Sequence, residues 1–177
     1  MNRNIKILVA MAGLLIAIHL VNILTGNALV SLGIYPRHFT SLPTILTAPL
    51  IHGSVGHLLN NLVPLLVLSF LLMLHSRQYF FRSVSFITVV CGALVWLFAR
   101  NTLHVGASGV IFGLWALCLC NSYFSRSWKN FAITVLVFFL YGGMIFGIFP
   151  GQVGISYESH FFGAVAGILY AYLYRSK

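Results

Sequence analysis

The sequence predicts an all-α membrane protein whose six helices cross the bilayer and pack as one bundle. Of its 177 residues, 60% are hydrophobic and only 6% are charged, whereas about a quarter of a typical soluble domain is charged. A spanning helix needs about 20 mostly apolar residues, and the chain contains six such runs between short polar or Gly/Pro-rich breaks. The runs are continuously apolar, which favours helices over the alternating strands of membrane barrels.

The six expected helices use nearly the whole chain, and we expect a single transmembrane domain over residues 1–177. The first run resembles a signal peptide because it follows Arg3 and Lys6, but it is longer than a typical signal core and lacks a small-residue cleavage site. It is therefore expected to stay as an anchor helix. The predicted helices lie near residues 5–23, 57–74, 83–98, 108–123, 131–149 and 157–174.

The formal net charge of +9 follows the loops between these helices. Such a bias matches the positive-inside rule and predicts that both termini are cytoplasmic. The excess of Lys and Arg is then explained by the orientation of the helices in the membrane, and no nucleic-acid partner is expected. The outer side keeps Arg37 and Arg100 beside the single acid, Glu158, while the cytoplasmic side collects Arg3, Lys6, Arg77, Arg82, Arg126, Lys129, Arg175 and Lys177.

Cysteine and metal-binding patterns give no sign of a metal or another cofactor. Cys91, Cys118 and Cys120 all lie in apolar runs without CxxC or zinc-site spacing, so they are interpreted as small core-filling residues. An intramembrane zinc protease would need the HExxH motif, which the sequence lacks. We therefore expect a protein that works without a metal.

Polar side chains inside apolar runs are candidate functional residues, because they are costly to place in hydrocarbon. With a cytoplasmic N-terminus, the second, fourth and sixth helices all begin at the outer face. His57 and Asn61 open the second helix, Ser108 opens the fourth, and His160 lies near the start of the sixth. These four residues should therefore meet at one depth, about one turn inside the membrane boundary.

Ser108 and His160 have the chemistry of a nucleophile and its base. A serine hydroxyl needs a nearby group to take its proton, and a neutral histidine is the usual choice. Burial disfavours the charged imidazolium and so keeps His160 available as a base. Glu158, the only carboxylate, lies two residues from His160 and would point elsewhere on a helix. The sequence thus predicts a Ser/His dyad and not a triad.

The residues around Ser108 favour stabilisation of an oxyanion. Gly106 and Gly109 permit a sharp loop-to-helix turn that exposes the serine hydroxyl and leaves its backbone amide free at the positive end of the helix dipole. His57 and Asn61 are four residues apart and share one helix face. Their side chains are expected to donate hydrogen bonds to the same oxygen.

Glycine spacing predicts close contact between the fourth and sixth helices. Gly109 and Gly113 form one GxxxG motif, and Gly163 and Gly167 form another. This spacing lets two membrane helices touch backbone to backbone. Gly163 lies on the same face as His160, so this contact would bring the histidine to the serine.

Less specific interpretations exist for each of these residues. A serine at a helix start is often only a cap. Lone histidines near a span are commonly interfacial or packing residues, as we interpret His19, His38 and His75. We expect His104 on the loop surface and interpret His52 as a supporting residue that orders the loop before the second helix. The conjunction of a serine motif, a histidine and a His/Asn pair at one depth favours catalysis.

Together these motifs resemble the rhomboid intramembrane serine protease family. The resemblance covers most of the chain in the family's order, through Leu32-Gly33-Ile34, the stretch 52–61, Gly106-Ala107-Ser108-Gly109 and the stretch 159–163. Many rhomboids carry Trp-Arg in the first outer loop, where this chain has Pro43-Thr44. The six helices are typical of a minimal bacterial member, which implies residence in the bacterial inner membrane.

The resemblance implies a role for each motif residue. Ser108 would be the nucleophile and His160 the general base, while His57, Asn61 and the Ser108 amide would form the oxyanion hole. Phe112 matches an aromatic position that packs on the catalytic histidine in rhomboids. The family cleaves other membrane proteins in or near their spanning helices without a cofactor, so the expected partners are transmembrane substrates and the lipid bilayer.

Two other functions of the same fold deserve comparison. A non-catalytic adaptor that binds transmembrane clients would have no need for both Ser108 and His160. A channel or transporter would need polar residues that continue to the cytoplasmic face, and few do. In the protease interpretation the fifth helix, with Gly142-Gly143 and Gly147, acts as a gate, and Pro64 kinks the second helix.

Overall fold

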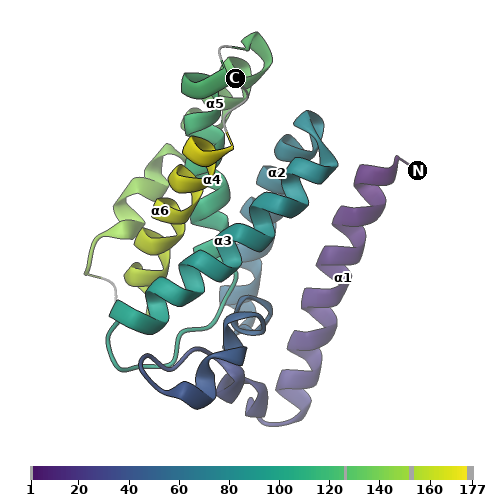
Figure 1. The fold of residues 1–177 in the computed structure, drawn as a ribbon. Coiled ribbons are helices and arrows are strands. Elements are labelled where there is room, and N and C mark those ends of the chain that lie inside the picture. The colour runs from purple at the N-terminus through teal and green to yellow at the C-terminus, as the bar shows by residue number, and fades with distance from the viewer. Residues whose placement is uncertain (1, 126, 152–153, 175–177) are drawn as a thin grey trace.

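The computed structural model is an up-and-down bundle of six α-helices, and it describes residues 2–125, 127–151 and 154–174. Successive helices run in opposite directions, so both termini lie at the same end of the bundle (Figure 1). This arrangement confirms the predicted all-α membrane fold. The helices are α1 (Arg3–Leu24), α2 (Val55–His75), α3 (Arg77–Phe98), α4 (Ser108–Ser125), α5 (Trp128–Tyr141) and α6 (Tyr157–Leu173).

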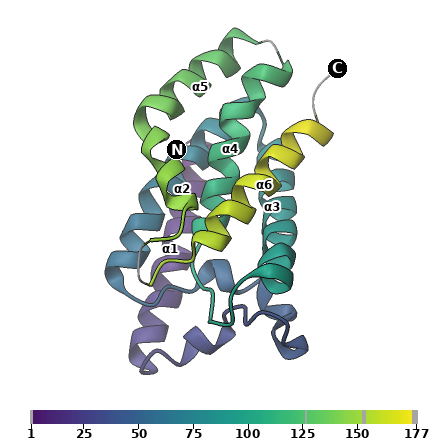
Figure 2. The same ribbon diagram turned by 90° about the vertical axis from the view of Figure 1, so that its left-hand side faces the viewer.

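The α4 helix forms the centre of the bundle. Almost every side chain from Ala107 to Cys118 is buried, because α2, α3, α5 and α6 all contact this helix. Figure 2 shows α6 beside α4 on one side and α5 on the other. A helix enclosed in this way holds its N-terminal residue in a fixed place.

Glycines let α4 and α6 approach backbone to backbone, as predicted. A Cβ atom added to Gly163 would overlap the carbonyl of Gly109, and one added to Gly167 would overlap the carbonyl of Gly113. Only glycine fits where two helix backbones come this close. The paired GxxxG motifs therefore fix the separation of the two helices that carry Ser108 and His160.

The long connection between α1 and α2 is built from four short 3₁₀ helices. Arg37 anchors this loop to the end of α3, where its guanidinium donates to the carbonyls of Leu97 and Ala99 at 3.2 and 2.8 Å. Thr44 donates to the carbonyl of Gly33 at 2.9 Å within the loop. The loop is thus ordered with Pro43-Thr44 in place of Trp-Arg. The 3₁₀ helices are η1 (Ala28–Leu32), η2 (Phe39–Ser41), η3 (Pro43–Ile45) and η4 (Ala48–Leu50).

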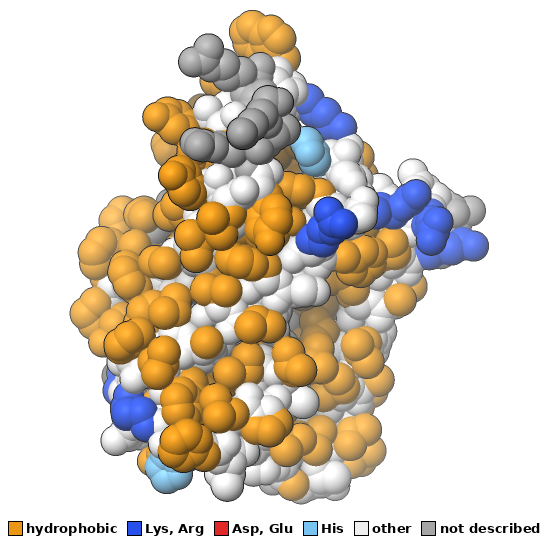
Figure 3. All heavy atoms as spheres, viewed as in Figure 1, with side chains coloured by type: hydrophobic (Ala, Val, Ile, Leu, Met, Phe, Trp, Pro, Cys, Tyr) orange, Lys and Arg blue, Asp and Glu red, His pale blue; other side chains and the backbone are white. Residues whose placement is uncertain are grey.

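The outer surface of the bundle is largely apolar, as a bilayer requires. Figure 3 shows hydrophobic side chains over most of the visible face, while Lys and Arg gather toward the end that holds the termini. By length and composition, α1, α2, α3 and the continuous segment Trp128–Ile148 are each able to cross a membrane, and Ser108–Phe124 is a shorter apolar helix. The protein is therefore an integral, multi-pass membrane protein.

Two helix boundaries differ from those predicted. The third helix begins at Arg77 and not near residue 83, because Ser76 caps it by accepting a hydrogen bond from the Tyr79 amide. The first turns of this helix carry Arg77 and Arg82, so a search for apolar residues placed its start too late. The fifth α-helix ends at Tyr141 and continues as the 3₁₀ helix η5 (Gly142–Ile148). Adjacent glycines at 142 and 143 disfavour the α-helical form at that point.

Candidate active site

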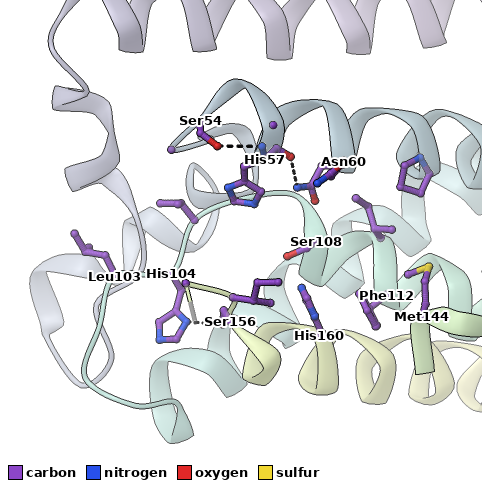
Figure 4. A pocket seen from close by; sticks show the side chains of 18 of the residues that line it. Ser54, His57, Asn60, Leu103, His104, Ser108, Phe112, Met144, Ser156 and His160 are labelled. Carbon is purple, nitrogen blue, oxygen red and sulfur yellow. Dashed lines mark hydrogen bonds between the residues drawn. The ribbon is translucent and has the colours of Figure 1, made fainter. Parts of the chain in front are cut away.

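A cavity of about 1130 Å³ brings the predicted site residues together. It lies between the start of α2, the loop before α4, the segment that includes η5, and the start of α6. Figure 4 shows Ser108 and His160 next to each other on the adjoining starts of α4 and α6, with His57 and Asn60 on the α2 side. The lining includes His57, Asn60, Asn61, Pro64, Ser108, Phe112, Met144 and His160.

Ser108 is the first residue of α4 and is only half-buried, so its side chain faces the cavity. The preceding turn requires glycine at position 106. Gly106 has a φ of +108°, and a Cβ there would lie 2.5 Å from Nε2 of His57. The first amides of a helix lack partners within it, so the Ser108 N–H also faces the cavity end of α4.

His160 is held in one orientation by two contacts. Its Nδ1 lies 2.9 Å from the carbonyl oxygen of Gly147, and its ring stacks on Phe112 with centroids 4.1 Å apart and planes inclined by 5°. A carbonyl only accepts, so Nδ1 carries the proton and donates it to Gly147. In the neutral ring Nε2 is then left with a free lone pair, which suits a base.

Ser108 and His160 face each other but are not hydrogen-bonded. Figure 4 shows the Ser108 and His160 side chains next to each other at the cavity. Within residues 2–125, 127–151 and 154–174, neither side chain has another side chain as a hydrogen-bond partner. Catalytic hydrogen bonds are often long before substrate binds, so the arrangement is compatible with a dyad.

His57 and Asn61 occupy the first turns of α2, which begins at the N-cap Ser54. The Asn61 side-chain amide donates to the His57 carbonyl at 2.7 Å. That bond uses one of two amide hydrogens and fixes the rotamer of Asn61. Both side chains line the cavity, as expected from their spacing of four residues.

Glu158 pairs with Arg100 and not with His160. Its carboxylate lies 2.9 Å from Nε of Arg100, and the side chain is buried at the start of α6. His160 instead turns toward Gly147. The Glu158 carboxylate therefore points away from His160, as its spacing of two residues on the helix predicted. Across the described parts of the chain, no three metal-ligating side chains cluster.

His52 supports the loop before α2 from a fully buried position. Its carbonyl accepts hydrogen bonds from His19 at 3.1 Å and from Asn22 at 3.2 Å, which ties the loop to α1. Its ring lies edge-on to His57, with centroids 5.0 Å apart. His52 thus packs behind a candidate oxyanion donor, and His19 is a buried packing residue.

Acidification should destabilise the fold through His52. Burial, aided by the neighbouring His57, lowers the pKa of His52 from 6.5 to about 4. The unfolded chain therefore binds a proton at this position between pH 6.5 and about 4, while the folded protein does not, so stability falls as the pH drops through that window. The apparent melting temperature in detergent should fall less from pH 7 to pH 4.5 in His52→Asn than in the parent. An equal fall in both proteins would contradict the prediction.

Two contributors to the site were not predicted. Gly147 supplies the acceptor for His160 through its backbone, and a backbone carbonyl leaves no mark in a sequence. His104 was expected on the loop surface but is buried, and burial lowers its pKa. The reason is that both ring nitrogens find partners inside the protein, on Ser156 and Arg100.

This fold and cavity define a polytopic membrane protein in which a serine at a helix start faces an oriented histidine. A model of the Rhomboid domain matches residues 40–177. An uncharacterized protein of Mycobacterium tuberculosis is 38% identical over 169 residues, which are 90% of this chain and 70% of that protein. The chain belongs to the Rhomboid family.

Two further relatives carry the family name. A candidate rhomboid protein of Acanthamoeba polyphaga mimivirus is 32% identical over 132 residues, covering 70% of each chain. RHOMBOID-like protein 4 of Arabidopsis thaliana is 27% identical over 136 residues, which are 73% of this chain and 33% of that protein. The Rhomboid domain match over residues 40–177 takes in α2 to α6 and the residues that line the cavity.

Proposed function

We propose that this protein is an intramembrane serine endopeptidase that cleaves transmembrane protein substrates in or near their spanning helices. The observation that carries the proposal is the orientation of His160. Its hydrogen bond to Gly147 leaves Nε2 unprotonated, and that side of the ring shares the cavity with the Ser108 hydroxyl. A serine hydroxyl beside a basic histidine nitrogen provides the two groups that acyl transfer needs.

In the proposed first step, the Ser108 Oγ attacks the carbonyl carbon of the scissile bond while its proton moves to Nε2 of His160. The substrate oxygen gains negative charge. The Ser108 backbone N–H, at the positive end of the α4 dipole, donates to this oxyanion. His57 and Asn61 face the same cavity and add side-chain donors.

In the second step, the tetrahedral intermediate collapses and the C–N bond breaks. His160 returns its proton to the leaving amine, which gives an acyl-enzyme on Ser108. A water molecule then loses a proton to His160 and attacks the ester carbonyl. When the second tetrahedral intermediate collapses, the bond between the acyl carbon and Ser108 Oγ breaks, His160 returns the proton to Oγ, and the new carboxyl end of the substrate is released. Phe112 keeps the ring plane fixed in both steps through its stacking contact.

Helix lengths support a site below the membrane surface. With 18 and 17 residues, α4 and α6 rise only about 27 and 26 Å, less than the hydrocarbon thickness of about 30 Å. Helices this short do not reach both surfaces, and we place the shortfall at their N-termini, where the cavity shields unpaired backbone groups. We assign this end to the outer face of a bacterial inner membrane, because the charge bias favours cytoplasmic termini.

Substrate entry is assigned to the side of the cavity bordered by α5 and η5. The α5 helix exposes large apolar side chains such as Phe138 and Phe139 to lipid. Gly142-Gly143 begins η5, whose Met144 lines the cavity. A substrate helix would pass this segment, unwind locally and present its carbonyl to Ser108.

The test is cleavage and labelling by the purified protein in detergent. The parent should cleave a model transmembrane substrate and react with a fluorophosphonate probe, and Ser108→Ala should do neither. Ser122→Ala, near the far end of α4 and outside the cavity lining, serves as a matched serine control and should behave like the parent. Cleavage that survives Ser108→Ala would overturn the assignment of the nucleophile.

The missing hydrogen bond between Ser108 and His160 favours a second candidate function, a non-catalytic adaptor for transmembrane clients. An adaptor would bind a client helix without reacting with the probe. If the parent co-purifies with the model substrate uncleaved and stays unlabelled, the adaptor function replaces the protease.

A further inference from the structure

A hydrogen-bonded chain joins the loop before α4 to the start of α6, outside the Ser108/His160 pair. Nδ1 of His104 lies 2.6 Å from the Ser156 hydroxyl, a contact drawn as a dashed line in Figure 4. Nε2 of His104 lies 3.1 Å from the Arg100 carbonyl. The Ser156 hydroxyl also lies 2.7 Å from the hydroxyl of Ser159. All of these contacts belong to segments that flank the cavity.

The donors and acceptors in this series of hydrogen bonds can be assigned in only one consistent way. The Arg100 carbonyl only accepts, so Nε2 of His104 donates to it and Nδ1 is the acceptor in the neutral ring. Ser156 therefore donates its hydroxyl proton to His104. Its oxygen accepts in turn from the amide of Ser159, as the N-cap of α6, and from the Ser159 hydroxyl. Each polar group has a partner, which makes the link directional and rigid.

The hydrogen bond between His104 and Ser156 joins the segment just before Ser108 to the segment just before His160. His104 precedes Ser108 by four residues of loop, and Ser156, the N-cap of α6, precedes His160 by about one helical turn. His104 is also fixed through its backbone, because it exchanges both amide hydrogen bonds with Ile34 of the first loop at 2.9 Å. A shift at the His104–Ser156 contact would therefore pass directly to both dyad residues.

We propose that His104 and Ser156 form a positioning pair that sets the separation of the Ser108 hydroxyl and the His160 ring. The inference rests on the proposed protease function and adds residues that act through the dyad without touching substrate. The charged groups that face His104 are Arg100 and Glu158, which form their own ion pair. That ion pair joins the same two segments and stays in place when the positioning pair is removed.

The expected signature is a loss of rate without a loss of structure. His104→Phe removes both hydrogen bonds but keeps a buried ring, and it should lower kcat roughly 10- to 100-fold because small misplacements of reacting groups cost that much. KM and the apparent melting temperature should stay close to the parent values. His38→Phe, at an exposed histidine of the first loop, is the matched control and should keep the parent kcat.

Two amide variants separate positioning from simple packing. In His104→Asn the side-chain oxygen replaces Nδ1 and still accepts from Ser156, whereas in His104→Gln the amide nitrogen replaces Nε2 and reaches only Arg100. The proposal expects Asn to restore most of the lost kcat and Gln to restore little. Ser156→Ala should lower kcat to a similar extent, and its combination with His104→Phe should add no further loss.

The rate of fluorophosphonate labelling distinguishes failure of the inference from failure of the proposed function. A parent that neither cleaves nor labels overturns the protease and the positioning pair together. A parent that labels at the same rate as His104→Phe overturns the positioning pair alone. Rescue by Gln as complete as by Asn, or additive losses in the double variant, would also overturn it.

Discussion

Replacing His160 with asparagine is expected to lower kcat at least about 1000-fold, while leaving the fold intact. The asparagine amide can still donate to the Gly147 carbonyl, as Nδ1 of His160 does in the parent. What it lacks is the basic nitrogen on the cavity side of the ring. The measurement is kcat for a model transmembrane substrate in detergent, together with the apparent melting temperature.

A companion variant tests whether stacking on Phe112 is needed to orient the His160 ring. Phe112→Leu removes the stacked ring 4.1 Å from His160 but keeps an apolar side chain. It should lower kcat far less than His160→Asn, because the Gly147 hydrogen bond still orients the base. If His160→Asn cleaved as fast as the parent, His160 would not be the base.

Replacing Gly163 with alanine is expected to cost more than about 3 kcal/mol of stability, although it adds a single methyl group. The new Cβ would overlap the Gly109 carbonyl on α4. That neighbour is backbone in a central helix, so it cannot rotate away as a side chain would. The two helices must separate, which opens the tightest contact of the bundle. The apparent melting temperature in detergent should fall by many degrees.

The same substitution elsewhere provides the control. Gly13 lies in α1, and an added Cβ there meets no atom within 4 Å. Alanine is the better helix former, so Gly13→Ala should leave stability unchanged or raise it slightly. A Gly163→Ala protein as stable as Gly13→Ala would show that the α4 and α6 backbones are farther apart than described.

The fold was predictable because the membrane restricts the choices. Six apolar runs leave little alternative to a helical bundle, and an even number of crossings puts both chain ends together. The GxxxG motifs predicted which helices touch, because glycine spacing reports directly on backbone distance. The convergence of Ser108, His160, His57 and Asn61 followed from the same reasoning, since alternate helices start at one face.

The parts that escaped prediction depend on contacts without a sequence signature. The acceptor for His160 is the carbonyl of Gly147, and any residue type has a carbonyl. His104 looked like a loop residue because its partner Ser156 lies 52 positions away. The change from α5 to η5 depends on how a glycine pair packs, and a hydropathy pattern does not indicate it. Polar contacts between distant residues and the roles of backbone groups can be identified only in the folded structure.

The partner of His160 has a consequence for how the site responds to acid. In a catalytic triad the group behind the histidine is a carboxylate, which can itself take up a proton. The Gly147 carbonyl does not titrate, so it can accept from Nδ1 whether the ring is neutral or protonated. Acidification of the folded protein therefore leaves this one contact in place, and it acts on His160 by protonating Nε2.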